Sequence, residues 1–245
     1  MMDGTFVTAF DEITAWPQVM TVNNRQQLTL PKGWTDATPK PPSSEPLVLT
    51  TLTGLCDYVL KNTDALILGG CLVHVKDPWI VELRGQLEAE SLEYRRMIFL
   101  RAMSPVMSPF GNYHDTETFL VWLQTGFVQT ESRDALLRLL ASIRDSEVRE
   151  TVDTGVSQEV KTGKGVALVG MTRVPNPVAL MPYRTFREIE QPASLFVLRL
   201  KSGQEGGLPT IALYEADGGA WKLEAIQRIA AFLQERIGPL VSIVA

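Results

Sequence analysis

The sequence predicts an α+β fold in which a mixed or antiparallel sheet is accompanied by about four helices. Short apolar runs typical of strands recur between residues 47 and 200, and helical spacing is clearest after Trp221. The first 46 residues end in a proline-rich stretch that favours extended backbone. We therefore expect an extended N-terminal arm over residues 1–46 and a single α+β domain over residues 47–245.

The domain is expected to begin with a short strand and a helix. Residues 47–49 are apolar and β-prone, and they predict the strand. Thr51 or Thr53 can then cap a helix, because a threonine hydroxyl accepts a hydrogen bond from a free N–H of the first turn. Leu55 and Val59 recur at helical spacing and predict its buried face.

A hairpin should follow. Residues 71–76 and 79–84 read as strands on either side of Asp77 and Pro78, which together favour a turn. Residues 86–104 are compatible with either a helix or a strand, because short apolar runs do not distinguish the two periods.

Two helices are expected next. Asp115 precedes an apolar run over residues 119–123 and fits the N-cap position. A second helix is expected over residues 131–145, because its leucine and isoleucine residues recur on one stripe. Both helices should pack on the core.

The remaining half of the domain is expected to be mainly β-structure with a long helix near its end. Residues 148–200 contain several strand-like runs, with a turn predicted at residues 162–165, and another strand is expected at residues 210–214. The spacing of isoleucine and leucine predicts a helix over residues 221–236, followed by a strand at residues 240–244.

Composition limits the functional classes. The chain has 45% hydrophobic and 21% charged residues, a net charge of −5 and a pI of about 5.2, which argues against a large nucleic-acid footprint. No apolar run approaches the ~18 residues of a membrane span, and the acidic start does not fit a signal peptide. We expect a cytoplasmic protein without a membrane partner, in which Cys56 and Cys71 are reduced and buried.

Two short motifs suggest catalysis, but a purely structural interpretation is favoured for each. Residues 153–155 spell Asp-Thr-Gly, as in aspartic proteases, yet a single copy lacks the second carboxylate, and a turn is favoured. Glu159 and Lys161 resemble the acid and lysine of Mg²⁺-dependent nucleases, with Asp145 or Asp153 as the upstream acid. A solvated strand face is the favoured explanation of that pair.

Metal and nucleotide sites lack their usual patterns. Cys56, Cys71, His74 and His114 have no spacing that suits zinc. Residues 163–165 spell Gly-Lys-Gly without the rest of a phosphate-binding loop, and no dinucleotide fingerprint is present. We therefore assign no catalytic residue, metal ligand or cofactor.

Two groups of residues are candidates for binding. Arg95, Arg96 and Arg101 alternate with aromatic residues, a combination that can stack bases and neutralise phosphates. A subunit interface or an ordinary amphipathic element is the alternative for this segment. Trp16 and Trp34 in the arm need burial, against either their own domain or a neighbouring subunit, which makes them interface candidates.

Three segments carry a family resemblance: residues 153–158 (DTGVSQ), 174–194 (VPNPVALMPYRTFREIEQPAS) and 215–222 (EADGGAWK). With them, the chain from about residue 49 to residue 245 resembles the YfdQ-like family of uncharacterised proteins of temperate phages and prophages. The resemblance implies a phage context and the cytoplasm of a bacterial host, without any activity. Within the second segment, the charges of Arg184 and Arg187 suit a rigid edge or an intersubunit contact, and a long connection in the β-region is the alternative.

We therefore expect a non-enzymatic protein that assembles with further copies of itself. A phage-capsid-like shell subunit is an alternative for the fold, because the order of elements is compatible with one. A nucleic-acid-binding accessory protein or a Mg²⁺-dependent nuclease in phage recombination is the second hypothesis. An inhibitor of a host defence protein is the third, and it is suggested by the phage context alone.

Overall fold

The computed structural model describes most of the chain. The residues covered are 18–22, 25–29, 45–90, 93–104, 110–144, 147–153, 158–164, 167–174, 176–201 and 208–245, and within residues 18–29, 88–95 and 144–174 the description is limited to the backbone. The chain divides into two compact units, residues 1–44 and 45–245, which are treated separately.

The smaller unit contains an antiparallel hairpin. Strand β1 (Gln18–Val22) pairs with β2 (Arg25–Thr29), with Val22 opposite Arg25. The segment for which we expect extended backbone therefore includes a pair of hydrogen-bonded strands.

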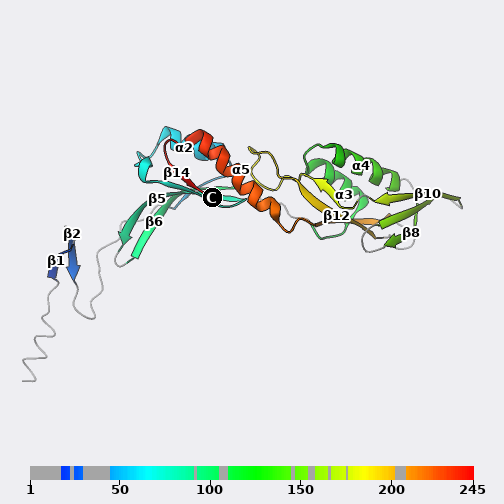
Figure 1. Cartoon of the computed structure of the whole chain (residues 1–245), viewed down its shortest axis with the longest axis horizontal. Coiled ribbons are helices and arrows are strands. Elements are labelled where there is room, and N and C mark those ends of the chain that lie inside the picture. The colour runs from blue at the N-terminus through cyan, green and yellow to red at the C-terminus, as the bar shows by residue number, and fades with distance from the viewer. Residues whose placement is uncertain are drawn as a thin grey trace, which may run out of the picture. The chain divides into compact units, whose positions relative to one another are not determined.

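The larger unit is α+β, which confirms the predicted class. Its described residues form four α-helices and sheets of five, four and three strands (Figure 1). Among those residues, no helix combines the length and the apolar character needed to cross a membrane.

The first core is built on the five-stranded sheet, whose order is β14-β4-β5-β6-β3. The strands β4, β5 and β6 are antiparallel, while β3 runs parallel to β6 and β14 parallel to β4. The predicted hairpin is present, and the ambiguous residues 86–104 belong largely to strands. The bounds are β3 (Leu47–Leu49), β4 (Leu72–Asp77), β5 (Ile80–Glu90), β6 (Glu93–Met103) and β14 (Ser242–Val244).

Two helices, α2 (Leu52–Lys61) and α5 (Ala220–Ile237), cover one face of this sheet (Figure 1). Thr51 is the N-cap of α2, and its hydroxyl accepts a hydrogen bond from the N–H of Gly54 at 3.1 Å. A short 3₁₀ turn, η1 (Leu68–Gly70), precedes β4. Alternate residues of the strands, such as Val73, point into this aliphatic core.

The second core lies under a four-stranded sheet of order β11-β12-β13-β7, packed against two helices. Asp115 caps α3 as predicted, since its carboxylate accepts from the N–H of Thr118 at 2.9 Å. This core is rich in aromatic rings, among them Phe119, Phe127 and Phe196. The elements are β7 (His114–Asp115), α3 (Thr116–Thr125), α4 (Glu131–Arg144), β11 (Val178–Leu180), β12 (Ser194–Lys201) and β13 (Thr210–Glu215).

The third sheet consists of β8 (Glu147–Asp153), β9 (Gln158–Lys164) and β10 (Ala167–Val174), all antiparallel. We predicted a turn at residues 162–165, but Thr162, Gly163 and Lys164 belong to β9. The prediction placed the turn too early because glycine is tolerated in a strand next to a bulge, and one falls between Leu168 and Gly170 on the partner strand.

A loop between β11 and β12 reaches from the second sheet to the first core. Phe186 and Ile189 of this loop are buried in the first cluster, although the loop begins and ends at strands of the second sheet. The loop thereby brings Arg184 to the place where the two cores meet.

Candidate functional site

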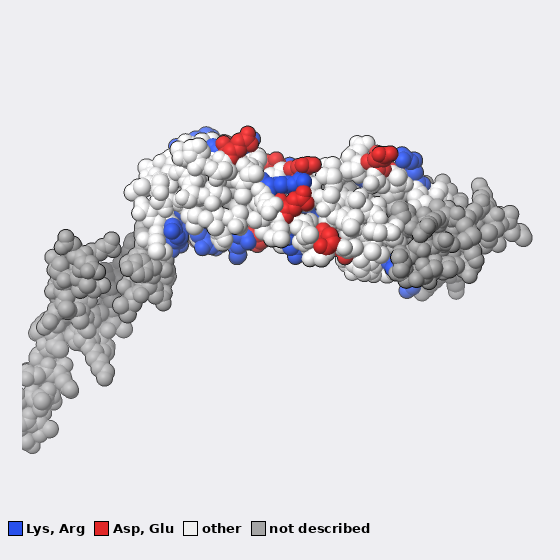
Figure 2. Space-filling model, in the orientation of Figure 1, with Lys and Arg blue, Asp and Glu red and all other residues white. Residues whose placement is uncertain are grey.

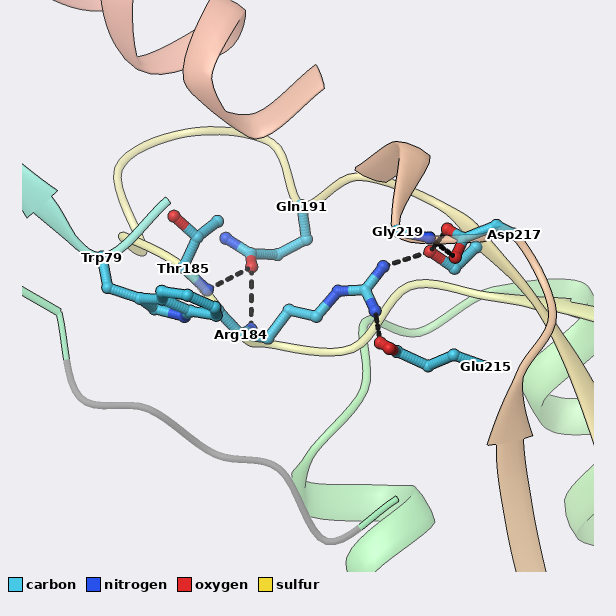
Figure 3. Close-up of polar contacts among 8 residues, drawn as sticks. Trp79, Arg184, Thr185, Gln191, Glu215, Asp217 and Gly219 are labelled. Carbon is cyan, nitrogen blue, oxygen red and sulfur yellow. Dashed lines mark hydrogen bonds and ion pairs between the residues drawn. The ribbon is translucent and has the colours of Figure 1, made fainter. Parts of the chain in front are cut away.

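A network of hydrogen bonds and ion pairs, which we call the junction cluster, surrounds Arg184 (Figure 3). Its members are Trp79, Arg184, Gln191, Ser194, Glu215, Asp217 and Trp221. The side chain of Arg184 is 2% exposed. Nη1 forms an ion pair with Glu215 at the end of β13, and Nη2 donates to the hydroxyl of Ser194 at the start of β12. That hydroxyl in turn donates to Asp217 at 2.5 Å. All three partners belong to the second sheet or the turn that follows it.

Two tryptophans on elements that pack around the first core complete the cluster. The guanidinium lies 3.8 Å from the centre of the Trp221 ring at the start of α5. The indole N–H of Trp79, in the β4–β5 turn, donates to the carbonyl of Arg184 at 2.7 Å. The two tryptophan rings meet edge to face at 5.8 Å. Arg184 therefore contacts elements that pack in the first core, α5 and the β4–β5 turn, as well as strands of the second sheet.

Gln191 holds the loop around Arg184 closed. Its side-chain oxygen accepts from the N–H groups of Arg184 and Thr185 at 3.1 and 3.3 Å. Its amide donates to the carbonyls of Phe186 and Ile189 at 2.8 and 3.2 Å. The buried amide thus satisfies four backbone groups that the loop itself leaves without partners.

The surroundings of Arg184 and Asp217 keep both side chains in their charged forms. Burial lowers the pKa of Arg184 to about 10, while Glu215 and Asp217 oppose that change. Burial raises the pKa of Asp217, but hydrogen bonds from Ser194 and from the Gly219 N–H outweigh it and leave that pKa below 3.8. Arg184 and Asp217 are therefore both charged at neutral pH. The cluster therefore stabilises the arrangement of the two cores, and Arg184, predicted to lie at an interface, makes its contacts inside its own chain.

A cavity of about 360 Å³ lies beside this loop, at the start of α2. Several hydroxyl groups line it, including those of Thr50 and Thr53. Glu188 accepts from the N–H of Thr53 at 3.1 Å, so a carboxylate of the chain already occupies the positive end of the helix. Arg187, the other predicted interface residue of this segment, is exposed at the rim and stacks on Tyr183 at 4.0 Å.

The second candidate surface is the side of the five-stranded sheet opposite α2 and α5, which we call the outer face. Alternation along the strands defines it, because neighbours of core residues point away from the core. Its members are Val48, Leu72, His74, Glu82, Arg84, Leu87, Arg96, Ile98, Arg101, Met103 and Val244.

Strand register brings these residues into rows. In the first row, His74 pairs with Glu82 and Glu82 pairs with Arg101. Val48 on β3 lies next to Arg101, and Val244 on β14 next to His74. Charged residues therefore occupy the centre of this row, and apolar residues both ends.

Further along the sheet, Arg84 pairs with Leu72 on one side and with Ile98 on the other. After a bulge, Leu87 pairs with Arg96. Arg96 also donates to the carbonyl of Gly85 at 2.8 Å. Each arginine of the outer face thus has an apolar neighbour across the strand.

Glu82 organises the charge of the outer face. Its carboxylate is buried and accepts from Arg84 at 2.5 and 3.0 Å and from Arg101 at 2.8 Å. Burial raises the pKa of Glu82, but hydrogen bonds and positive charge from both arginines outweigh it and hold the pKa below 4.5. Because Glu82 is covered, the charge that the face presents to solvent is mainly positive. Figure 2 shows Lys and Arg atoms gathered along the lower side of the view, in the region of β5 and β6.

Apolar side chains are also accessible on the outer face. Val48 is 59% exposed, Leu87 56% and Val244 49%. Among the described elements, the helices that pack on this sheet both lie on the opposite side. The outer face thus combines cationic and apolar groups, and this composition suits binding.

The predicted nucleic-acid residues are only partly brought together. Arg96 and Arg101 share the outer face, five residues apart on β6 with a bulge between them. The backbone of Arg95 pairs with Glu88, and its side chain falls outside the description. Sequence reasoning missed Arg84 and Glu82, although their alternation within residues 79–84 indicated a shared face.

Other candidates lie partly or wholly outside the described residues. Trp16 and Trp34 are among the residues without a description, and for Asp153, Glu159 and Lys161 only the strand positions are given. Within the part of the chain whose side chains are described, no group of three or more His, Cys, Asp or Glu residues could hold a metal ion.

Both cysteines are buried, as the sequence predicted. Burial raises the pKa of Cys56 to about 11 and also raises that of Cys71. At neutral pH both thiols are protonated, which makes them poor nucleophiles and poor metal ligands.

Compared with known proteins, the chain matches no family model, no curated protein and no solved structure. The resemblance to YfdQ-like proteins and the capsid-like alternative for the fold therefore stay predictions.

Proposed function

We propose that this is a non-enzymatic protein, encoded by a phage or prophage and acting in the host bacterial cytoplasm, that functions by assembling with further copies of itself. The observation that carries the proposal is the outer face, on which accessible apolar side chains alternate with arginines. Removing apolar area of this kind from water supplies about 25 cal/mol per Å², and the arginines add specificity.

The exposed strand edges support the same function. The sheet ends on one side at β3 and on the other at β14, each of three residues. The β5–β6 hairpin extends beyond its neighbouring strands on both sides. Strand β4 pairs with β5 only as far as Arg84, and β3 pairs with β6 only as far as Leu100. Two-stranded segments gain stability from a further partner. A neighbouring copy would supply one.

The test is the mass of the full chain in solution, measured by size-exclusion chromatography with light scattering. We expect the wild type to be larger than a monomer and Val48→Asp to shift the equilibrium towards monomer. Val121→Asp is the matched control, because Val121 is also exposed but lies on α3, away from the outer face. A monomeric wild type would exclude the proposed function.

Binding of single-stranded nucleic acid is the second candidate. The observation that favours it is that Arg84, Arg96 and Arg101 share the outer face. Three phosphate contacts would weaken the affinity about twentyfold between 50 and 200 mM salt. A gel-shift series with a single-stranded oligonucleotide would measure this, and Arg96→Glu should reduce binding further. Binding that is insensitive to salt and to Arg96→Glu would exclude the outer face as its site.

A further inference from the structure

On the outer face, arginines lie next to apolar residues, a pattern that suits a partner in which acidic and apolar groups alternate. Val48 lies next to Arg101 in the strand register, and Leu87 lies opposite Arg96. The side chain of Arg101 is 40% exposed, although one of its nitrogens contacts Glu82. A partner that satisfies these positions needs carboxylates next to large apolar side chains, at the spacing of neighbouring residues.

The first 17 residues of the chain have this composition. They contain Asp3, Asp11 and Glu12, and neither lysine nor arginine. The adjacent acids Asp11 and Glu12 lie between Phe10 and Ile13. Other large apolar residues of the segment are Phe6, Val7 and Trp16.

Within the first 44 residues, the combination of apolar residues with acidic residues alone is restricted to residues 1–17. Residues 18–44 include Arg25, Lys32 and Lys40 against a single acid, Asp36. Only the first 17 residues therefore combine apolar side chains with purely negative charge in this part of the chain.

We propose that the outer face of one copy binds residues 1–17 of a second copy. The inference rests on the proposed self-assembly and names the segment that accomplishes it. An extended chain of 17 residues spans up to about 55 Å, whereas five strands are about 19 Å wide, so the segment is long enough to cross the sheet. Residues 18–46, which include the β1–β2 hairpin, connect this segment to the larger unit in the sequence.

Two full-length variants test the proposal. In the first, Asp11→Arg and Glu12→Arg reverse the charge of the segment. In the second, Arg96→Glu and Arg101→Glu reverse the charge of the outer face, and Arg96→Glu alone is made in case the loss of Arg101 beside Glu82 impairs folding. Circular dichroism and thermal melting establish that each variant is folded before its mass is measured by light scattering.

Each reversed variant should be mainly monomeric alone, with self-association weakened about tenfold or more. An equimolar mixture of the two should assemble again, because each segment then meets an outer face of opposite charge on the other copy. Recovery in the mixture cannot arise from a segment that binds within its own chain.

The outcomes separate the two proposals. A monomeric wild type removes self-assembly and this inference together. An oligomeric wild type whose mass neither reversal changes leaves self-assembly in place and overturns the role of residues 1–17. Variants that are monomeric alone and remain monomeric when mixed also overturn it.

Discussion

Arg184 and Arg101 each pair with a glutamate, but their surroundings differ. Arg184 is 2% exposed and is bonded to Glu215 and Ser194, with Trp221 stacked on it. The side chain of Arg101 is 40% exposed on the outer face and contacts Glu82 through Nε. The buried arginine directs Nη1 and Nη2 to partners within its own chain, whereas the exposed one keeps donors that a partner can use. The comparison separates a residue that maintains architecture from one that is available for binding.

The largest effect is expected at the junction cluster. Arg184→Ala should lower the free energy of unfolding by about 3 kcal/mol, because Glu215 and Asp217 would lose the charge that compensates their partial burial. Urea denaturation measures the change. Arg187→Ala is the control, since Arg187 is exposed and stacks on a single ring, and it should cost about 1 kcal/mol or less. Equal losses in the two variants would show that the junction cluster does not stabilise the cores.

An intermediate effect is expected for Glu82→Gln. The pKa of Glu82 is lower in the folded protein than in the unfolded chain, so its ionised form stabilises the fold. This contribution is present above the pKa of the unfolded chain and is lost as the pH falls through the folded pKa. The variant should lose about 1–3 kcal/mol at pH 7 and show a weaker acid dependence than the wild type. Urea midpoints between pH 3 and pH 7 test this. Parallel pH profiles for the two proteins would contradict the assignment.

The smallest effect on stability is expected for Arg101→Gln. Solvent screens an ion pair whose cation is as exposed as Arg101, so the pair contributes about 1 kcal/mol or less, and Arg84 still neutralises the buried Glu82 in this variant. Self-association should nevertheless weaken, since a cation of the outer face is lost. Urea denaturation and light scattering on the same sample give both quantities. A loss of stability as large as that of Arg184→Ala would remove the distinction between the two arginines.

Local rules explain which elements could be predicted. Asp115 caps α3 and Thr51 caps α2 because a helix start depends on residues within one turn. The hairpin around Asp77 and Pro78 is equally local: Asp77 accepts hydrogen bonds from the N–H groups of Trp79 and Ile80, both at 2.8 Å. Such features can be inferred from a short window of sequence.

Distant partners explain what could not be predicted. Arg184 meets Glu215 and Trp79 across 31 and 105 positions, so neither its burial nor its internal role follows from nearby residues. The sequence of β6 did not distinguish a helix from a strand, because bulges on both β5 and β6 interrupt the alternation of side chains near Arg84. The outer face likewise depends on the register of five strands, two of them from opposite ends of the domain.

The central claim is that copies of the chain meet at the outer face, and site-specific photo-crosslinking tests it most directly. A photoreactive amino acid is placed at position 48 on the outer face or at position 121 on α3, in otherwise wild-type full chains. Illumination should give a covalent dimer from position 48 and none from position 121. A dimer from position 121 alone, or none from either position, would contradict the claim.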